Sequence, residues 1–231
     1  RGDITVGCSL DEGMAAMRAL AALHASWWNS EAVARMPWLQ TRRARLDLAL
    51  EMIDQAWPTF VSRFEQGLDR DQFQALAGLR PLIGRSLDAL AGGSLTLLHG
   101  DYKLDNMFFT DAGSVTVFDW GLVSTGPAMF DVAYFLGLNL EPEERRRHEA
   151  KLLRAYLDGI AAHGVAQFDG ESAFAEYRLQ LLSVLPQLVC AGGLAAFADD
   201  QALERYARGL QRILAAVSDH QSWDLLRAKK A

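Results

Sequence analysis

The chain has 231 residues, 50% of them hydrophobic, a length at which folding buries about 70% of the unfolded surface, so we expect one globular domain. Its net charge of −6 argues against sequence-independent nucleic-acid binding, and no apolar run reaches the ~18 residues of a membrane span, so we expect neither kind of partner. Cys8 and Cys190 are too few for a disulfide framework and favour a reducing compartment, the cytoplasm.

The first predicted element is a helix that runs from a capping box at Ser9 and Glu12 to about Trp28. Its apolar residues recur every three or four positions and form one face, which also contains His24. We expect His24 to be buried and hydrogen-bonded to the backbone, and not to be catalytic.

Two further helical stretches precede the middle of the chain. Residues 40–56 predict a helix that is interrupted near Pro58, because proline lacks the amide donor and clashes with the preceding turn. Residues 73–90 predict an amphipathic stretch that Pro81 splits.

A short strand is expected next. Residues 94–98 form an apolar run after two glycines, which indicates a buried strand that carries His99 into a loop. Asp101 then lies just beyond the carboxyl end of this strand.

A β-hairpin follows, with arms at residues 107–110 and 114–118 and a glycine-containing turn at 111–113. Arms of roughly equal length, rising about 3.3 Å per residue, bring the two ends of a hairpin together. The hairpin should therefore place Asn106 beside Asp119.

The rest of the chain predicts four helices, over residues 128–138, 141–163, 171–190 and 200–218. The basic cluster Arg145–Arg147 follows several glutamates, and we expect it on a solvated helix face. The predicted fold class is α+β, mainly α, with the small hairpin at the candidate site.

The pattern around the hairpin is typical of metal-dependent phosphoryl transfer. Mg²⁺ prefers carboxylate and amide oxygens, which Asn106 and Asp119 offer as metal ligands and cofactor-binding residues. Asp101, five residues before Asn106, suits the base that deprotonates an acceptor hydroxyl. Lys103 either neutralises the transferred phosphoryl group, as a catalytic and cofactor-binding residue, or faces solvent.

These residues resemble the aminoglycoside phosphotransferase and choline-kinase-like superfamily, including its ecdysteroid-kinase-like branch. The resemblance is carried by the motif at 99–106, by 118–121 and 126–134, and more weakly by 20–28. It implies a protein-kinase-like C-terminal lobe, ATP as phosphoryl donor, Mg²⁺ as cofactor and a hydroxylated small molecule as acceptor. It also implies structural support of the site: His99 would organise the catalytic loop, and Asp131 would brace it.

The resemblance also implies an N-terminal β lobe, which we do not find in this sequence. The chain begins with Arg1, and no lysine precedes Lys103 to serve as the phosphate-binding lysine of that lobe. We therefore expect residues 1–10 to be the end of an interlobe hinge and residues 11–231 the C-terminal lobe, with the other lobe packing on it. An isolated lobe would be inactive. A natural lone lobe is the alternative.

Other functions fit the sequence less well. A metallohydrolase would need more histidine ligands at suitable spacing, and the sequence has neither a G-x-S-x-G nucleophile elbow nor a Walker loop. The remaining alternative is a catalytically silent kinase-like binding module. The acceptor is not determined, although Trp27, Trp28 and Phe197 are candidates to line a hydrophobic acceptor pocket, or equally to fill the core.

Overall fold

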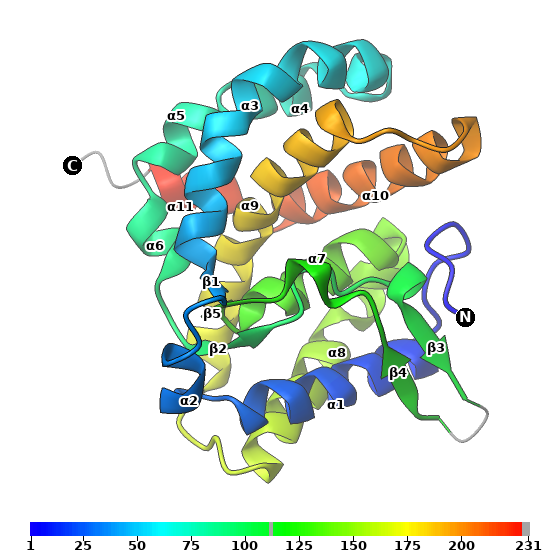
Figure 1. The fold of residues 1–231 in the computed structure, drawn as a ribbon. Helices are drawn as coiled ribbons and strands as arrows, with labels where there is room; N and C mark the ends of the chain where they lie inside the picture. The colour runs from blue at the N-terminus through cyan, green and yellow to red at the C-terminus, as the bar shows by residue number, and fades with distance from the viewer. Residues whose placement is uncertain (111–112, 228–231) are drawn as a thin grey trace.

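The computed structural model describes residues 1–110 and 113–227, and it is mainly helical with two small sheets (Figure 1). The α-helices are α1 (Leu10–Ser26), α2 (Glu31–Ala34), α3 (Arg42–Phe64), α4 (Arg70–Ala77), α5 (Leu79–Gly84), α6 (Leu87–Ala91), α7 (Met129–Asn139), α8 (Pro142–Ala162), α9 (Gly170–Leu194), α10 (Asp200–Asp219) and α11 (Ser222–Arg227). The strands are β1 (Gln40–Thr41), β2 (Leu95–Leu98), β3 (Met107–Phe109), β4 (Val115–Val117) and β5 (Ser124–Pro127). The predicted fold class is confirmed.

Helix α1 begins as the sequence predicts. The Ser9 hydroxyl accepts the Glu12 amide, and the Glu12 carboxylate accepts the Ser9 amide at 2.9 Å. His24 is fully buried, also as predicted. The expected hydrogen bond from its ring to the backbone was wrong, because the ring lies between two side chains, Tyr156 and Asp131.

The predicted interruption at Pro58 was also wrong, since α3 continues through it to Phe64. Ile53 and Phe60, on either side of the proline, are both buried in the same core. Proline in a helix costs about 3 kcal/mol, and burial of one large apolar side chain contributes about 1.5–3 kcal/mol, so a continuous buried face outweighs the loss. Asp54, whose carbonyl loses its amide donor, is exposed to water.

The third helical stretch is divided into α4, α5 and α6, but Pro81 is not a break. The breaks fall at Gly78 and around Ser86. Pro81 lies in the first turn of α5, where a missing amide donor costs nothing because the helix has no partner for it.

The three-stranded sheet has the order β1-β5-β2. Strand β2 is the predicted strand, and it pairs antiparallel with β5, with Leu98 opposite Ser124. Strand β5 was not predicted, because Ser124–Pro127 contains a glycine and a proline, which are depleted in strands, and only one β-branched residue, Thr125. Gly126 there leaves room for Arg42, whose Cβ would lie 2.6 Å from an added Cβ.

The predicted hairpin is confirmed as β3 and β4, with Met107 opposite Val117. The Thr110 amide donates to the Ser114 carbonyl at 3.0 Å, which closes the end of the hairpin. Of the predicted turn at 111–113, residues 111 and 112 lie outside the described part of the chain.

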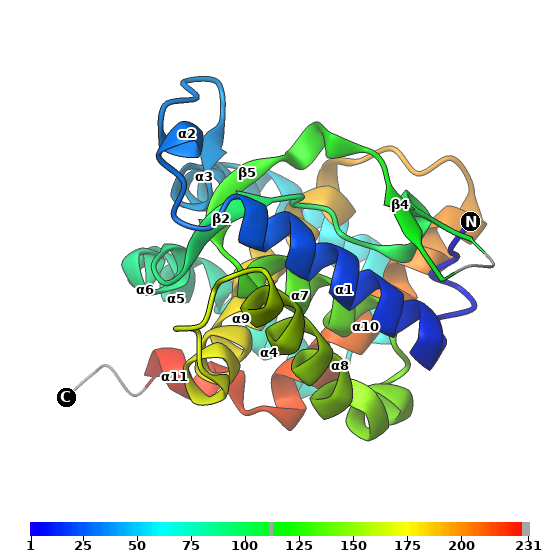
Figure 2. The same ribbon diagram turned by 90° about the horizontal axis from the view of Figure 1, so that it is seen from below.

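Helix α7 occupies the centre of the molecule. It lies between α1 and α8 on one side and α9 and α10 on the other (Figures 1 and 2). All of its residues are buried, which accounts for its apolar character on every face. In the part of the chain that the structure describes, no helix is both long and apolar enough to cross a membrane.

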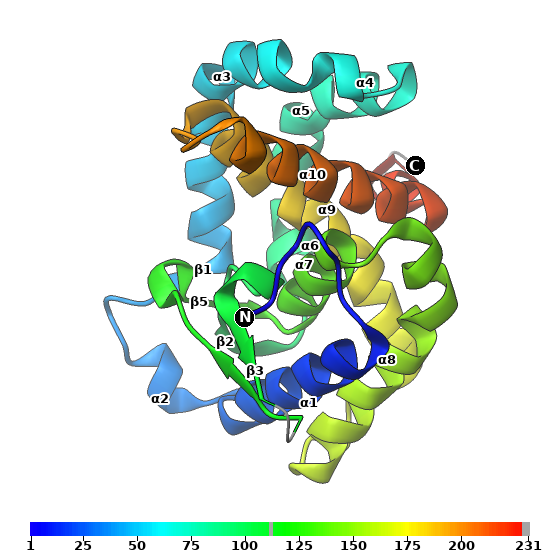
Figure 3. The same cartoon turned by 90° about the vertical axis from the view of Figure 1, so that its right-hand side faces the viewer.

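The first eight residues lie against the candidate site and α10 (Figure 3). The Gly2 amide donates to the Met107 carbonyl at 2.9 Å, and the Ile4 amide donates to the Asp105 carboxylate at 3.0 Å. The segment at the start of the chain is thereby fixed to the start of the hairpin. Its assignment as an interlobe hinge stays a prediction.

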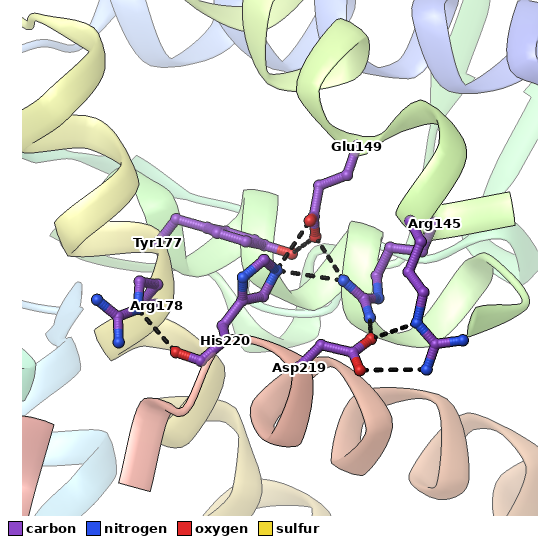
Figure 4. A network of polar contacts seen from close by, with 7 residues as sticks. Arg145, Glu149, Tyr177, Arg178, Asp219 and His220 are labelled. Carbon is purple, nitrogen blue, oxygen red and sulfur yellow. Dashed lines mark hydrogen bonds and ion pairs between the residues drawn. The ribbon is translucent and has the colours of Figure 1, made fainter. Parts of the chain in front are cut away.

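A cluster of buried charges joins α8, α9 and α10 (Figure 4). Arg145 is only 1% exposed and forms ion pairs with Glu149 and Asp219, and Glu149 also accepts hydrogen bonds from Tyr177 and His220. The predicted solvated face was therefore wrong for Arg145, although the other two arginines of that cluster are exposed. Helix periodicity alone did not reveal that α10 would cover this position.

Candidate active site

The loop between β2 and the hairpin turns sharply at Gly100. Its φ is +82°, and a Cβ added there would lie 2.1 Å from the Leu122 carbonyl oxygen. Both the left-handed backbone and the close approach of another chain segment require glycine. This turn directs the following residue, Asp101, away from the strand and toward α7.

Asp131, in the first turn of α7, holds this loop in place. Its two carboxylate oxygens accept the amides of His99 at 2.6 Å and Gly100 at 2.9 Å, and Asp131 is fully buried. The His24 ring lies 3.3 Å from the same carboxylate. A buried carboxylate that satisfies two backbone donors fixes the conformation of the loop.

His99 connects the loop to the second arm of the hairpin. Its Nδ1 accepts the Asp101 amide at 3.2 Å, so its Nε2 carries the proton and donates to the Phe118 carbonyl at 3.0 Å. The Trp120 ring packs on the imidazole, with centroids 4.6 Å apart. Both ring nitrogens are engaged with backbone groups, an arrangement that suits loop organisation more than proton transfer.

The Asp101 carboxylate is held by three donors. Tyr134 donates to one oxygen at 2.7 Å, and Lys103 and Asn106 donate to the other at 2.8 and 2.9 Å. Burial and the nearby Asp101 charge keep the pKa of Tyr134 well above its ordinary value, so the phenol stays a donor. A carboxylate with three fixed donors is oriented for contact with a second molecule.

Asn106 and Asp119 mark the two ends of the hairpin. The Phe118 amide donates to the Asn106 carbonyl at 3.0 Å, so the hairpin ends meet as predicted. Asp119 has a left-handed backbone with φ of 63°, a conformation in which Asp is enriched. Its side chain is exposed and has no hydrogen-bond partner among the described residues.

The donor chemistry of this pair fits Mg²⁺. Asn106 donates through Nδ2 to two oxygens of Asp101, which leaves its amide oxygen available, and the Asp119 carboxylate is unpaired within the described chain. Among described residues, no group of three or more His, Cys, Asp or Glu side chains is arranged to hold a metal. A magnesium ion at Asn106 and Asp119 would therefore complete its coordination with water and substrate phosphates, as is usual for this ion.

A cavity of about 350 Å³ opens beside Asp101 and Lys103. It lies between the N-terminal segment and helices α7, α9 and α10, and most of its lining is apolar. Phe197 lines it, as the sequence suggested, whereas Trp27 and Trp28 do not, since Trp28 packs on Phe168 with centroids 5.2 Å apart. Its volume is within the range of about 300–1,000 Å³ of small-molecule sites.

Sequence reasoning missed the residues that support the loop from α3 and α9. Gln187 donates to the Gly100 carbonyl at 3.0 Å and accepts Arg42 at 3.2 Å. Arg42 is buried, with its guanidinium 3.7 Å from the Phe130 ring centroid, and burial lowers its pKa to about 9. The hydrogen bond from Tyr134 to Asp101 was missed too, although Tyr134 lies within the motif at 126–134 that carries the family resemblance. No local sequence motif predicts the hydrogen-bond partners of these residues, which are distant in the chain.

The site thus combines a loop held by Asp131, an oriented Asp101 carboxylate and an Asn106–Asp119 pair whose chemistry fits Mg²⁺, features that are expected of a phosphotransferase. Over residues 11–168, more than half of the chain, the sequence matches the phosphotransferase enzyme family. The protein belongs to this family, which confirms the resemblance that the sequence motifs indicated.

Other comparisons add less. A search of curated proteins found no match. Among solved structures the chain is similar to choline kinase LicA from Streptococcus pneumoniae, with 17% identity and a TM-score of 0.48, over 92% of this chain and 66% of that one. The chain thus spans 66% of the length of that choline kinase.

Proposed function

We propose that the protein is an ATP-dependent kinase that transfers a phosphoryl group to a hydroxyl of a small molecule. The observation that carries this proposal is the Asp101 carboxylate, which three donors orient at the edge of a cavity of about 350 Å³. Family membership supports phosphoryl transfer, and the cavity supports a small acceptor.

Asp101 has the role of general base in this proposal. It accepts the proton of the acceptor hydroxyl while the oxygen bonds to phosphorus and the bond from phosphorus to the ADP oxygen breaks. Lys103, paired with Asp101 at 2.8 Å, places a positive charge beside the transferred group. His99 and Asp131 act only by holding the loop.

Asn106 and Asp119 would hold Mg²⁺. When bound, the ion would supply positive charge that neutralises the phosphates. Asp119 supplies an exposed carboxylate for it, and Asn106 contributes its amide oxygen while its Nδ2 fixes Asp101. The same amide therefore connects the metal position to the base.

Substrates and partners of the whole protein follow from the same proposal. We propose a hydroxylated small molecule as acceptor, neither nucleic acid nor membrane as partner, and an N-terminal lobe that covers the nucleotide. Cys8 and Cys190 are both free thiols, which supports the cytoplasm as the proposed location.

The test is acceptor-dependent ADP release by the whole protein with Mg·ATP and a panel of alcohols. Asp101→Asn keeps the shape of the side chain and removes the base, and it should lower turnover by about 10²–10⁴. Asp119→Ala should abolish turnover at all Mg²⁺ concentrations. The matched control is Asp88→Asn, the same change at a carboxylate that is 98% exposed and distant from the site in the fold, and it should retain wild-type turnover.

Two results would contradict the proposal. Retention of more than about a tenth of wild-type turnover by Asp101→Asn would remove that residue from the role of base. A wild-type protein that binds alcohols without releasing ADP would instead be a catalytically silent binding module.

A further inference from the structure

Helix α7 directs two side chains at the loop between β2 and the hairpin. Asp131 accepts the backbone amides of the two residues that precede Asp101. Tyr134 follows three residues later on the same face of α7, and its hydroxyl donates to the Asp101 carboxylate at 2.7 Å. Tyr134 is only 4% exposed, and it lines the cavity together with Asp101. The helix that holds the backbone of the loop therefore also holds its carboxylate.

The Asp101 carboxylate has one hydrogen-bonding position left. A carboxylate offers about four lone-pair positions, about two on each oxygen. Lys103 and Asn106 occupy both positions on Oδ2, at 2.8 and 2.9 Å, whereas Oδ1 accepts only Tyr134 among the described residues. The Asp101 side chain is 12% exposed and lines the cavity. The second position on Oδ1 is therefore the one that a molecule in the cavity can occupy.

Two residues behind Tyr134 fix the direction of its hydroxyl group. Arg42 has only donors, so its contact at 3.2 Å engages the amide oxygen of Gln187. The amide nitrogen of Gln187 is turned toward the loop, where it donates to the Gly100 carbonyl at 3.0 Å. Burial and the Asp101 charge raise the pKa of Tyr134, and a hydrogen bond from Gln187 opposes them, which is the effect of a donor to the phenol oxygen. The phenol hydrogen is thereby left for Asp101.

We propose that Tyr134 is a positioning residue for phosphoryl transfer, and that Oδ1 of Asp101 takes the proton of the acceptor hydroxyl. A hydrogen-bond chain runs from Arg42 through Gln187 and Tyr134 to Asp101, and each side chain donates to the next. The alcohol donates its own hydrogen to the open position of Oδ1. This proton moves to Oδ1 as the alcohol oxygen bonds to phosphorus and the electron pair of the broken bond leaves with ADP. The proposal rests on the proposed function.

Tyr134 also favours the alcohol over water as the acceptor. Without the phenol oxygen, Oδ1 has two open positions and a small polar space beside them, which a water molecule fits. Water in this space competes with the alcohol for Asp101. Loss of the Tyr134 hydroxyl should therefore slow transfer to the alcohol more than transfer to water.

The experiment measures ADP release by the whole protein with Mg·ATP, first in water alone and then with a series of neutral alcohols from glycerol to octanol. The readout is the ratio of alcohol-dependent to alcohol-independent release, which does not depend on the fraction of folded protein. Tyr134→Phe keeps the buried ring and should lower this ratio at least about tenfold, because a hydrogen bond to a charged group is lost. The KM for Mg·ATP should not change.

Two further variants show whether Tyr134 acts through Asp101. The matched control is Tyr177→Phe, because Tyr177 is a fully buried phenol that donates to a different carboxylate, Glu149, and it should leave the ratio unchanged. In protein that already carries Asp101→Asn, Tyr134→Phe should change turnover with the alcohol by less than about twofold, since the group that it positions is no longer a base.

Proton NMR of the same proteins tests the hydrogen-bond chain without nucleotide. The buried Tyr134 hydroxyl should give a slowly exchanging signal that Tyr134→Phe removes, Asp101→Asn shifts and Tyr177→Phe leaves in place. Three results would overturn the proposal: a ratio that Tyr134→Phe leaves unchanged, an equal loss in the Asp101→Asn background, or the lack of a hydroxyl signal that responds to Asp101→Asn. A wild-type protein that gives the expected signals but releases no ADP with any of these alcohols would instead refute the proposed kinase function, and with it the role of Tyr134, but not the hydrogen-bond chain.

Discussion

Replacement of Asp131 by alanine should damage both stability and activity, because this buried carboxylate of α7 accepts two backbone amides of the loop between β2 and the hairpin. Asp131→Ala leaves the amides of His99 and Gly100 without an acceptor in a site that water does not reach. His24 loses the same partner. Asp101 directly follows Gly100 in the chain, so it loses the fixed backbone that positions it.

The magnitude follows from the number of unsatisfied donors. Each buried donor without a partner costs about 1–3 kcal/mol, so the two amides together cost about 2–6 kcal/mol. For a chain of this size, about 1 kcal/mol shifts the melting temperature by about 2–4 °C, which predicts a decrease of about 4–24 °C. The upper end approaches the whole stability of an ordinary domain, about 5–15 kcal/mol.

The assay is urea denaturation and thermal melting of wild type, Asp131→Ala and Asp131→Asn. Asparagine keeps the shape but offers one acceptor oxygen in place of two, so it should lie between wild type and alanine. The control is Asp54→Ala, which removes an exposed carboxylate paired with Arg80 and should change stability by at most about 1 kcal/mol. An unchanged melting temperature for Asp131→Ala would refute the bracing role.

Three further predictions concern the backbone, the buried charges and the nucleotide. Gly100→Ala should be far more destabilising than Gly113→Ala in thermal melts, because both have positive φ but only Gly100 has a backbone oxygen 2.1 Å from the added Cβ. Burial alone would raise the pKa of Glu149, but hydrogen bonds from His220 and Tyr177 hold it below its ordinary value of 4.5. The ionised Glu149 carboxylate therefore stabilises the folded state above about pH 4.5, and this stabilisation is lost as the pH falls through the lowered pKa of the folded state. Glu149→Gln removes the titrating group, so the free energy of unfolding measured by urea denaturation should decrease less steeply at acid pH than in the wild type. Residues 1–231 have no lysine before position 103 to bind phosphates, so calorimetry should give a Mg·ATP dissociation constant weaker than micromolar, and micromolar binding would contradict this.

The sequence by itself determined the elements whose causes are local. The capping box of Ser9 and Glu12 starts α1 because both partners lie within one turn. The hairpin brings Asn106 to the start of one arm and Asp119 to the end of the other, because equal arms must return the chain to its origin. Since Asn106 and Asp119 lie at the two ends of this one hairpin, their convergence was predictable from the sequence, without the tertiary structure.

Tertiary structure decided the features whose partners are distant in the chain. Helix α3 passes through Pro58 because α9 covers both sides of its buried face, and Arg145 is buried because Asp219 of α10 lies over it. Gln187 supports the Gly100 carbonyl across 87 residues of sequence. Local propensity reflects energies of a few kcal/mol within one helix or strand. Burial between elements depends instead on which of their faces pack together, and the spacing of residues along the sequence does not specify this packing.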